Sequence, residues 1–142
     1  MKNEIKKTWH FDQAPGEVWE YLIKPELMEL WLMKNDFKPV VGHKFSFTFT
    51  ETDKNPYVGR VECEVLEVVP FSKLSYSWHG GTRDGSRTFD TVVEWTLVPK
   101  NKGTELRLSH NGFTAMEDIL AHSGGWGSCI KKIQDSINSH TK

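Results

Sequence analysis

His110 is the residue whose type and position best suit acid–base chemistry or the orientation of a ligand. It continues the alternation of Leu106 and Leu108, so we expect its side chain to face the apolar side of a strand. The ordinary pKa of imidazole, about 6.5, allows proton transfer near neutral pH. The other interpretation is a histidine at the edge of the core, hydrogen-bonded to the backbone. His79, at a strand end, is a weaker candidate for a pocket mouth. The remaining histidines are expected to be solvated: His10, His43, His122 and His140.

No other group of residues has the spacing of a catalytic or metal site. Cys63 and Cys129 stand 66 positions apart without a CxxC motif, which predicts two buried thiols rather than a disulfide or a zinc site. The segment Ser123–Ser128 lacks the lysine of a phosphate loop, and its glycines are expected to allow close helix–sheet approach or a bend where a helix starts. The strand carboxylates fall on the solvent side: Glu62, Glu64 and Glu94. We therefore assign no catalytic residue, no metal ligand and no cofactor.

Length and charge limit the classes of protein to which this chain can belong. Its 142 residues predict one domain, residues 1–142. Lys plus Arg number 18 and Asp plus Glu number 19, which disfavours a nucleic-acid partner. No apolar run approaches the roughly 18 residues that span a bilayer, so no membrane insertion is expected. The N-terminus does not resemble a secretory signal, and the few cysteines suit a reducing compartment, which predicts a cytoplasmic protein.

The first third of the chain predicts one strand followed by two short helices. Residues 5–11 alternate with a period of two. Pro15 suits the first turn of a helix that carries Val18, Trp19 and Leu22 at helical spacing. Pro25 interrupts that helix and can start a second one, which ends near Trp31.

Five antiparallel strands and a long helix are predicted for the rest of the chain. The strands are expected at residues 45–49, 61–69, 74–78, 93–97 and 106–108, where apolar and polar residues alternate. The helix carries Trp126, Ile130, Ile133 and Ile137 on one face, with Ser123 as its expected N-cap and residues 116–120 as a separate short turn. These elements predict an α+β fold in which a curved, six-stranded antiparallel sheet wraps around the C-terminal helix.

Short motifs in the same order along nearly the whole chain resemble a known family. They are Ala14-Pro15-Gly16-Glu17-Val18-Trp19 with Leu22, Pro25-Glu26 and Trp31; Gly42 with Phe45, Phe47 and Phe49; Gly103-Thr104-Glu105-Leu106; and Gly125-Trp126. Together they resemble the START-like (SRPBCC, Bet v 1-like) superfamily, in the branch related to the activator of heat-shock-protein ATPase. The resemblance implies a helix-grip fold with a cavity between the sheet and the long helix. It also implies hydrophobic ligands such as lipids, sterols or polyketides, catalysis in some members, and a chaperone partner in that branch.

Within that fold we expect large side chains from several elements to line an apolar cavity that binds a small hydrophobic molecule. The expected lining residues are Trp31, Met33, Phe47, Phe49, Trp78, Trp95, His110, Phe113, Trp126 and Ile130. Each of these residues could equally be filling the core. Two further hypotheses are an enzyme of cyclase or hydrolase type that uses His110, and an interaction module that contacts a chaperone or another protein. The third hypothesis predicts an exposed apolar patch on the outer face of the sheet.

Overall fold

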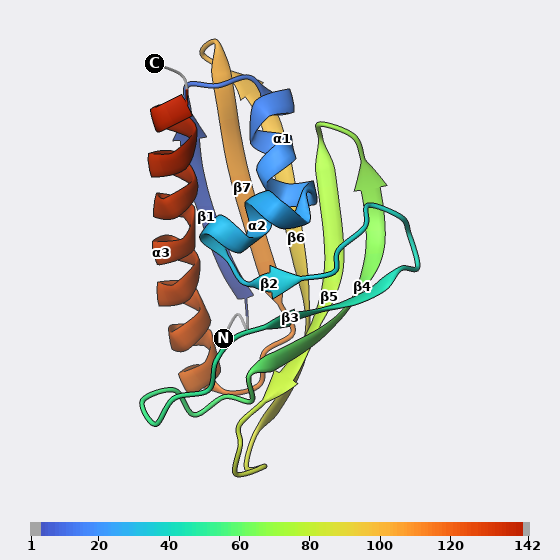
Figure 1. Ribbon diagram of the computed structural model, residues 1–142, viewed down its shortest axis with the longest axis vertical. Coiled ribbons are helices and arrows are strands. Elements are labelled where there is room, and N and C mark those ends of the chain that lie inside the picture. The colour runs from blue at the N-terminus through green and yellow to red at the C-terminus, as the bar shows by residue number, and fades with distance from the viewer. Residues whose placement is uncertain (1–3, 141–142) are drawn as a thin grey trace.

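The structure is a computed structural model, which describes residues 4–140 as ten elements. The strands are β1 (Glu4–Phe11), β2 (Lys34–Asn35), β3 (Lys44–Thr48), β4 (Arg60–Val69), β5 (Lys73–Gly81), β6 (Thr88–Lys100) and β7 (Gly103–Asn111). The helices are α1 (Pro15–Ile23), α2 (Pro25–Trp31) and α3 (Met116–His140). All strands pair antiparallel in the order β1–β7–β6–β5–β4–β3–β2. In Figure 1, α1 and α2 lie over β6 and β7, beside the long helix α3. The predicted α+β fold is confirmed.

The two short helices divide at Lys24, as the prolines predict. Pro15 and Pro25 each occupy the first turn of a helix, where the missing N–H has no intrahelical partner to lose. Lys24 is extended and ends α1 while it begins α2. The indole N–H of Trp31 donates a hydrogen bond of 2.7 Å to the carbonyl oxygen of Tyr21, which ties α2 back onto α1.

One face of the sheet is apolar and packs against the helices. The alternating residues of the strands that face inward are buried: Phe45, Phe47, Val61, Cys63, Val65, Tyr76, Trp78, Val93, Trp95, Leu97, Leu106 and Leu108. They meet the predicted stripe of α3, in which Trp126, Ile130, Ile133 and Ile137 are all buried. The outer face carries charged pairs, among them Lys73 with Glu67 and with Glu94. The period of two therefore separates an apolar core from a charged surface.

The sheet has seven strands rather than the predicted six. The additional strand, β2, contains only Lys34 and Asn35, which pair with Thr48 and Phe47 of β3. Two residues are too few to show a period of two, so the sequence pattern contains no signal for this strand. It holds the segment after α2 against the edge of the sheet.

The prediction that α3 begins near Ser123 was wrong. The helix begins at Met116 and runs for 25 residues, so the expected short turn at residues 116–120 is its first part. Gly124, Gly125 and Gly127 lie inside it. Each helical glycine costs about 1 kcal/mol relative to alanine but keeps its backbone N–H, so packing against the sheet maintains the helix. A Cβ atom at Gly124 or Gly125 would meet open space, so these two glycines do not serve close helix–sheet approach.

No helix among residues 4–140 combines the length and apolarity that crossing a membrane requires.

Candidate ligand-binding cavity

A cavity of about 380 Å³ lies between the inner face of the sheet and the N-terminal half of α3. Its walls come from three parts of the fold. Helix α3 contributes Ala121, His122, Gly125, Trp126 and Cys129. The sheet contributes Val61, Trp78, Gly80, Gly81 and Phe89. The segments after α2 and between β3 and β4 contribute Leu32, Met33, Phe49, Asn55, Tyr57 and Val58. The size falls at the lower end of the range for small-molecule sites, and most of the lining is apolar.

Small residues on α3 leave room at the open side of this cavity. Ala121, Gly125 and Cys129 follow one another at intervals of four and therefore share a helix face. The side chain position of Gly125 is empty space, since no atom lies within 4 Å of a Cβ built there. Because Gly125 lines the cavity, a larger residue there would add atoms to this part of the wall.

The residues predicted from sequence to line a cavity fall into two groups. Met33, Phe49, Trp78 and Trp126 do line it. The others are buried in the core behind its wall and are at most 1% exposed: Trp31, Phe47, Trp95, His110, Phe113 and Ile130. Close packing by neighbouring side chains explains why the second group does not border the cavity. The ring of Trp95 lies edge-on to Trp31 at 6.0 Å and to Trp126 at 5.3 Å, so neighbouring rings occupy the space around it.

His110 faces the interior, as its alternation with Leu106 and Leu108 predicts, but it does not reach the cavity. Its Nδ1 accepts a hydrogen bond of 3.0 Å from the indole N–H of Trp126. Its Nε2 therefore carries the proton and donates to the Thr91 hydroxyl at 2.8 Å, which donates in turn to the Trp78 carbonyl oxygen. Burial lowers the pKa of His110 to about 2, so the ring stays neutral. Its partners are thus side chains rather than the backbone expected for a core histidine.

His122 is the histidine that lines the cavity, and the expectation that it is solvated was wrong. Its Nδ1–H donates to the carbonyl oxygen of Asp118 at 2.8 Å, and its Nε2 accepts from the Trp78 indole N–H at 3.2 Å. Burial lowers its pKa, which favours this neutral form. A helix that begins at Met116 places His122 one turn before Trp126 on the same face. Because the helix was predicted to begin only after Ser123, His122 was not placed on the same helix face as Trp126.

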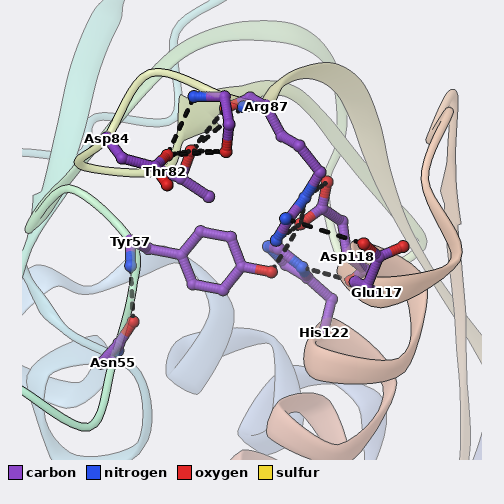
Figure 2. A network of polar contacts seen from close by, with 9 residues as sticks. Asn55, Tyr57, Thr82, Asp84, Arg87, Glu117, Asp118 and His122 are labelled. Atoms are coloured by element: carbon purple, nitrogen blue, oxygen red, sulfur yellow. Dashed lines mark hydrogen bonds and ion pairs between the residues drawn. The ribbon is translucent and has the colours of Figure 1, made fainter.

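A polar cluster fastens the loop between β3 and β4 to the start of α3 beside the cavity. The Tyr57 hydroxyl donates to the Asp118 carboxylate at 2.6 Å, and the Arg87 guanidinium donates to the same carboxylate at 3.3 Å (Figure 2). The Asp118 side chain is only 2% exposed, so these two donors satisfy a buried charge. Burial, followed by the bond to Asp118, raises the pKa of Tyr57 to about 12. Tyr57 therefore stays a neutral hydrogen-bond donor to Asp118 at neutral pH.

The same loop is fastened from its other side by the hairpin that joins β5 and β6. Arg83 donates through Nη2 to the carbonyl oxygens of Thr52 and Asn55, at 2.9 Å each. Tyr57 forms an isolated bridge with Thr82. Asn55 Oδ1 accepts the backbone N–H of Tyr57 at 2.9 Å, which holds both residues at the cavity wall (Figure 2). No periodic pattern connects Tyr57 with Asp118, so the sequence contains no signal for this contact.

The two cysteines are free thiols in different surroundings. Cys63 is buried under the sheet, as predicted. Cys129 is only partly buried and lies in the cavity wall. Burial raises the pKa of both thiols, so both remain protonated near neutral pH. Neither has the low pKa that a nucleophilic cysteine requires.

Comparison with solved structures finds the same fold along nearly the whole chain. Protein MLL2253 from Mesorhizobium loti is 33% identical, with a TM-score of 0.85 over 98% of each chain. The Aha1 dimer from Colwellia psychrerythraea is 17% identical, with a TM-score of 0.75 over 94% of this chain and 95% of that chain. DynU16, a protein of the dynemicin biosynthetic locus, is 15% identical, with a TM-score of 0.81 over 99% of this chain and 49% of that chain. None of the curated protein sequences matches this chain.

The family resemblance inferred from the short motifs is confirmed by a family model. The model described as "Activator of Hsp90 ATPase homolog 1-like protein" matches residues 5–138, from β1 to the last turn of α3. The match thus includes every element that borders the cavity. This chain belongs to the family of activator of Hsp90 ATPase homolog 1-like proteins.

Proposed function

We propose that this protein binds a small hydrophobic molecule in the cavity between the sheet and α3. The observation that carries the proposal is the cavity itself: about 380 Å³ of space with a mainly apolar lining, between the sheet and α3. A concave space of this size with a mostly apolar lining has the usual form of a small-molecule site. The family and the structural neighbours agree with this proposal at the level of the fold.

Binding would draw its free energy from the burial of apolar surface. Each Å² of apolar surface removed from water contributes roughly 25 cal/mol, before the cost of ordering the ligand is subtracted. The rings of Phe49, Trp78, Phe89 and Trp126 in the wall add contacts that favour other rings.

The enzymatic alternative has less support than simple binding. The acid–base candidate His110 is 0% exposed, has both ring nitrogens engaged and lies outside the cavity wall. His122 lines the cavity, but its two nitrogens are also engaged. A general acid or base must reach the proton that it transfers, and neither ring offers a free nitrogen for that purpose.

The proposal is tested with N-phenyl-1-naphthylamine, an uncharged probe whose fluorescence rises in apolar surroundings. We expect the wild-type protein to bind the probe and Gly125→Leu to weaken that binding at least about tenfold, because the leucine occupies the cavity. Gly124→Leu is the matched control. Gly124 is the adjacent helical residue, its Cβ position is also open, and it does not line the cavity.

The two glycine variants separate cavity binding from nonspecific association. Both replace a helical glycine and should keep the fold, which a thermal unfolding curve verifies. Equal probe affinity in the wild-type protein and both variants would contradict the proposal. So would the absence of probe binding together with the absence of any co-purified small molecule in native mass spectrometry.

A further inference from the structure

Charge is missing from the wall of the cavity. In the described part of the chain, the lining contains no Lys, Arg, Asp or Glu. The Asp118 carboxylate beside the cavity already has partners, because it accepts from both Arg87 and Tyr57. A charged group carried into this wall would lose water without gaining a partner of opposite charge, which is strongly unfavourable. The buried part of a ligand must therefore be uncharged.

Almost every polar side chain in the wall is already hydrogen-bonded. The Tyr57 hydroxyl donates to Asp118, and both nitrogens of His122 are engaged. The indole N–H groups of Trp78 and Trp126 donate to histidine nitrogens within the protein. None of these donors is free for a ligand without breaking an existing bond.

Asn55 is the exception. Its Oδ1 accepts the backbone N–H of Tyr57 at 2.9 Å, and this bond fixes which way the amide points, because an amide nitrogen cannot accept it. The Nδ2 group then retains donor capacity that no described residue uses. The backbone of Asn55 is held as well, by its N–H bond to the Thr52 carbonyl and by the Arg83 guanidinium on its own carbonyl. Asn55 is thus held in place at the cavity wall and is half-buried as a residue.

Six of the other fifteen lining residues carry aromatic rings. The cavity is bordered by Phe49, Tyr57, Trp78, Phe89, His122 and Trp126. Aromatic side chains pack best against other rings, in offset or edge-to-face arrangements. We propose, building on the proposed function, that the cavity selects an uncharged aromatic molecule with one hydrogen-bond acceptor, such as a ring ketone, which Asn55 Nδ2 binds at the cavity wall.

The test compares three molecules that share one ring system. Fluorene has no polar group, fluorenone adds a carbonyl acceptor, and fluorene-9-carboxylate adds a negative charge. Each is titrated into protein that carries bound N-phenyl-1-naphthylamine, and displacement is followed by loss of the probe's fluorescence. We expect fluorenone to bind about fivefold more tightly than fluorene, which is the contribution of one ordinary hydrogen bond. We expect the carboxylate to bind at least about tenfold more weakly than fluorenone.

Asn55→Asp tests the assigned donor directly. The aspartate keeps an oxygen that can accept the Tyr57 backbone N–H, so the loop retains its local bond, while the amide donor is lost. We expect the preference for fluorenone over fluorene to disappear in this variant, with fluorene affinity unchanged. Infrared spectroscopy gives a second measurement. The carbonyl stretch of bound fluorenone should fall in frequency in the wild-type protein, and the fall should be absent in Asn55→Asp.

The outcomes separate this inference from the proposed function on which it rests. If fluorene and fluorenone bind equally to the wild-type protein, or if their ratio survives in Asn55→Asp, Asn55 is not the donor and the inference is overturned. If the carboxylate binds as tightly as fluorenone, the requirement for an uncharged ligand is overturned. In each of these cases Gly125→Leu would still weaken binding, and the proposed function would stand. If these molecules displaced the probe equally well from Gly125→Leu and from the wild-type protein, both the inference and the proposed function would be contradicted.

Discussion

The indole N–H of Trp126 on α3 donates a hydrogen bond to Nδ1 of His110 on β7, at 3.0 Å within the buried core. This bond fixes the neutral tautomer of the histidine, whose Nε2–H continues to the Thr91 hydroxyl. It also fastens the long helix to β7, next to the edge strand β1, through polar groups in otherwise apolar surroundings. Buried polar groups of this kind are costly to leave without a partner.

Trp126→Phe should therefore destabilise the protein beyond the loss of ring size. The variant leaves His110 Nδ1 buried without a donor, and we expect the free energy of unfolding to fall by about 2–3 kcal/mol in urea titrations. Trp9→Phe is the control, since Trp9 is only half-buried in β1. Equal losses of stability in the two variants would show that the Trp126–His110 bond contributes nothing measurable.

Stability should also decrease on acidification because of His110. The pKa of this residue is about 2 in the folded protein, against about 6.5 in the unfolded chain. Below pH 6.5, His110 is protonated in the unfolded chain but stays neutral in the folded protein. The free energy of unfolding therefore falls by about 1.4 kcal/mol for each pH unit, down toward the folded pKa. His122, whose pKa is also lowered by burial, acts in the same direction.

The measurement combines NMR with urea unfolding. The His110 ring resonances should not titrate between pH 8 and pH 5 in the folded protein. The pH dependence of the unfolding free energy should become shallower in His110→Gln than in the wild-type protein. A His110 resonance that titrates near pH 6 would contradict the burial argument.

The arrangement of the sheet and helices follows from patterns that are visible in the sequence. Strand β3 alternates throughout and β6 alternates from Val93 to Leu97, and α3 keeps its apolar stripe from Trp126 to Ile137, so side-chain period identifies these elements. Two features escaped this reasoning. Strand β2 is too short to alternate, and the glycines near Trp126 suggested a helix start where the helix in fact continues. Glycine lowers the intrinsic helix propensity of this segment, but the packing of α3 against the sheet outweighs that cost.

The candidate site was less predictable than the fold because it depends on long-range contacts. Large aromatic residues such as Trp78 and Trp95 look alike in sequence, yet the first lines the cavity and the second fills the core. The difference comes from which neighbours occupy the space beside each ring. Tyr57 and Asp118 are 61 positions apart and belong to a loop and a helix start, so no local spacing connects them. Such sites are set by the packing of elements rather than by any one of them.

Tyr57→Phe should loosen the loop between β3 and β4. The variant removes the hydroxyl that donates to Asp118 at 2.6 Å, so we expect faster amide hydrogen exchange across residues 51–59 and a loss of about 1–2 kcal/mol of stability. Tyr21→Phe is the matched control, because the Tyr21 hydroxyl bonds to Ser136 at 2.9 Å, away from this loop. Unchanged exchange at residues 51–59 in Tyr57→Phe would show that Arg83 and the hairpin hold the loop without Asp118.

Gly124→Ala should stabilise the protein by about 0.5–1 kcal/mol. The residue lies inside α3, its Cβ position is open, and alanine lowers the conformational entropy of the unfolded chain while it favours the helix. Gly112→Ala should have the opposite effect. Gly112 has a φ of +104° and its Cβ would approach Asp90 O at 3.3 Å, so an alanine there is strained. Thermal unfolding measures both changes. A fall in melting temperature for Gly124→Ala would mean that α3 needs the flexibility of its glycines.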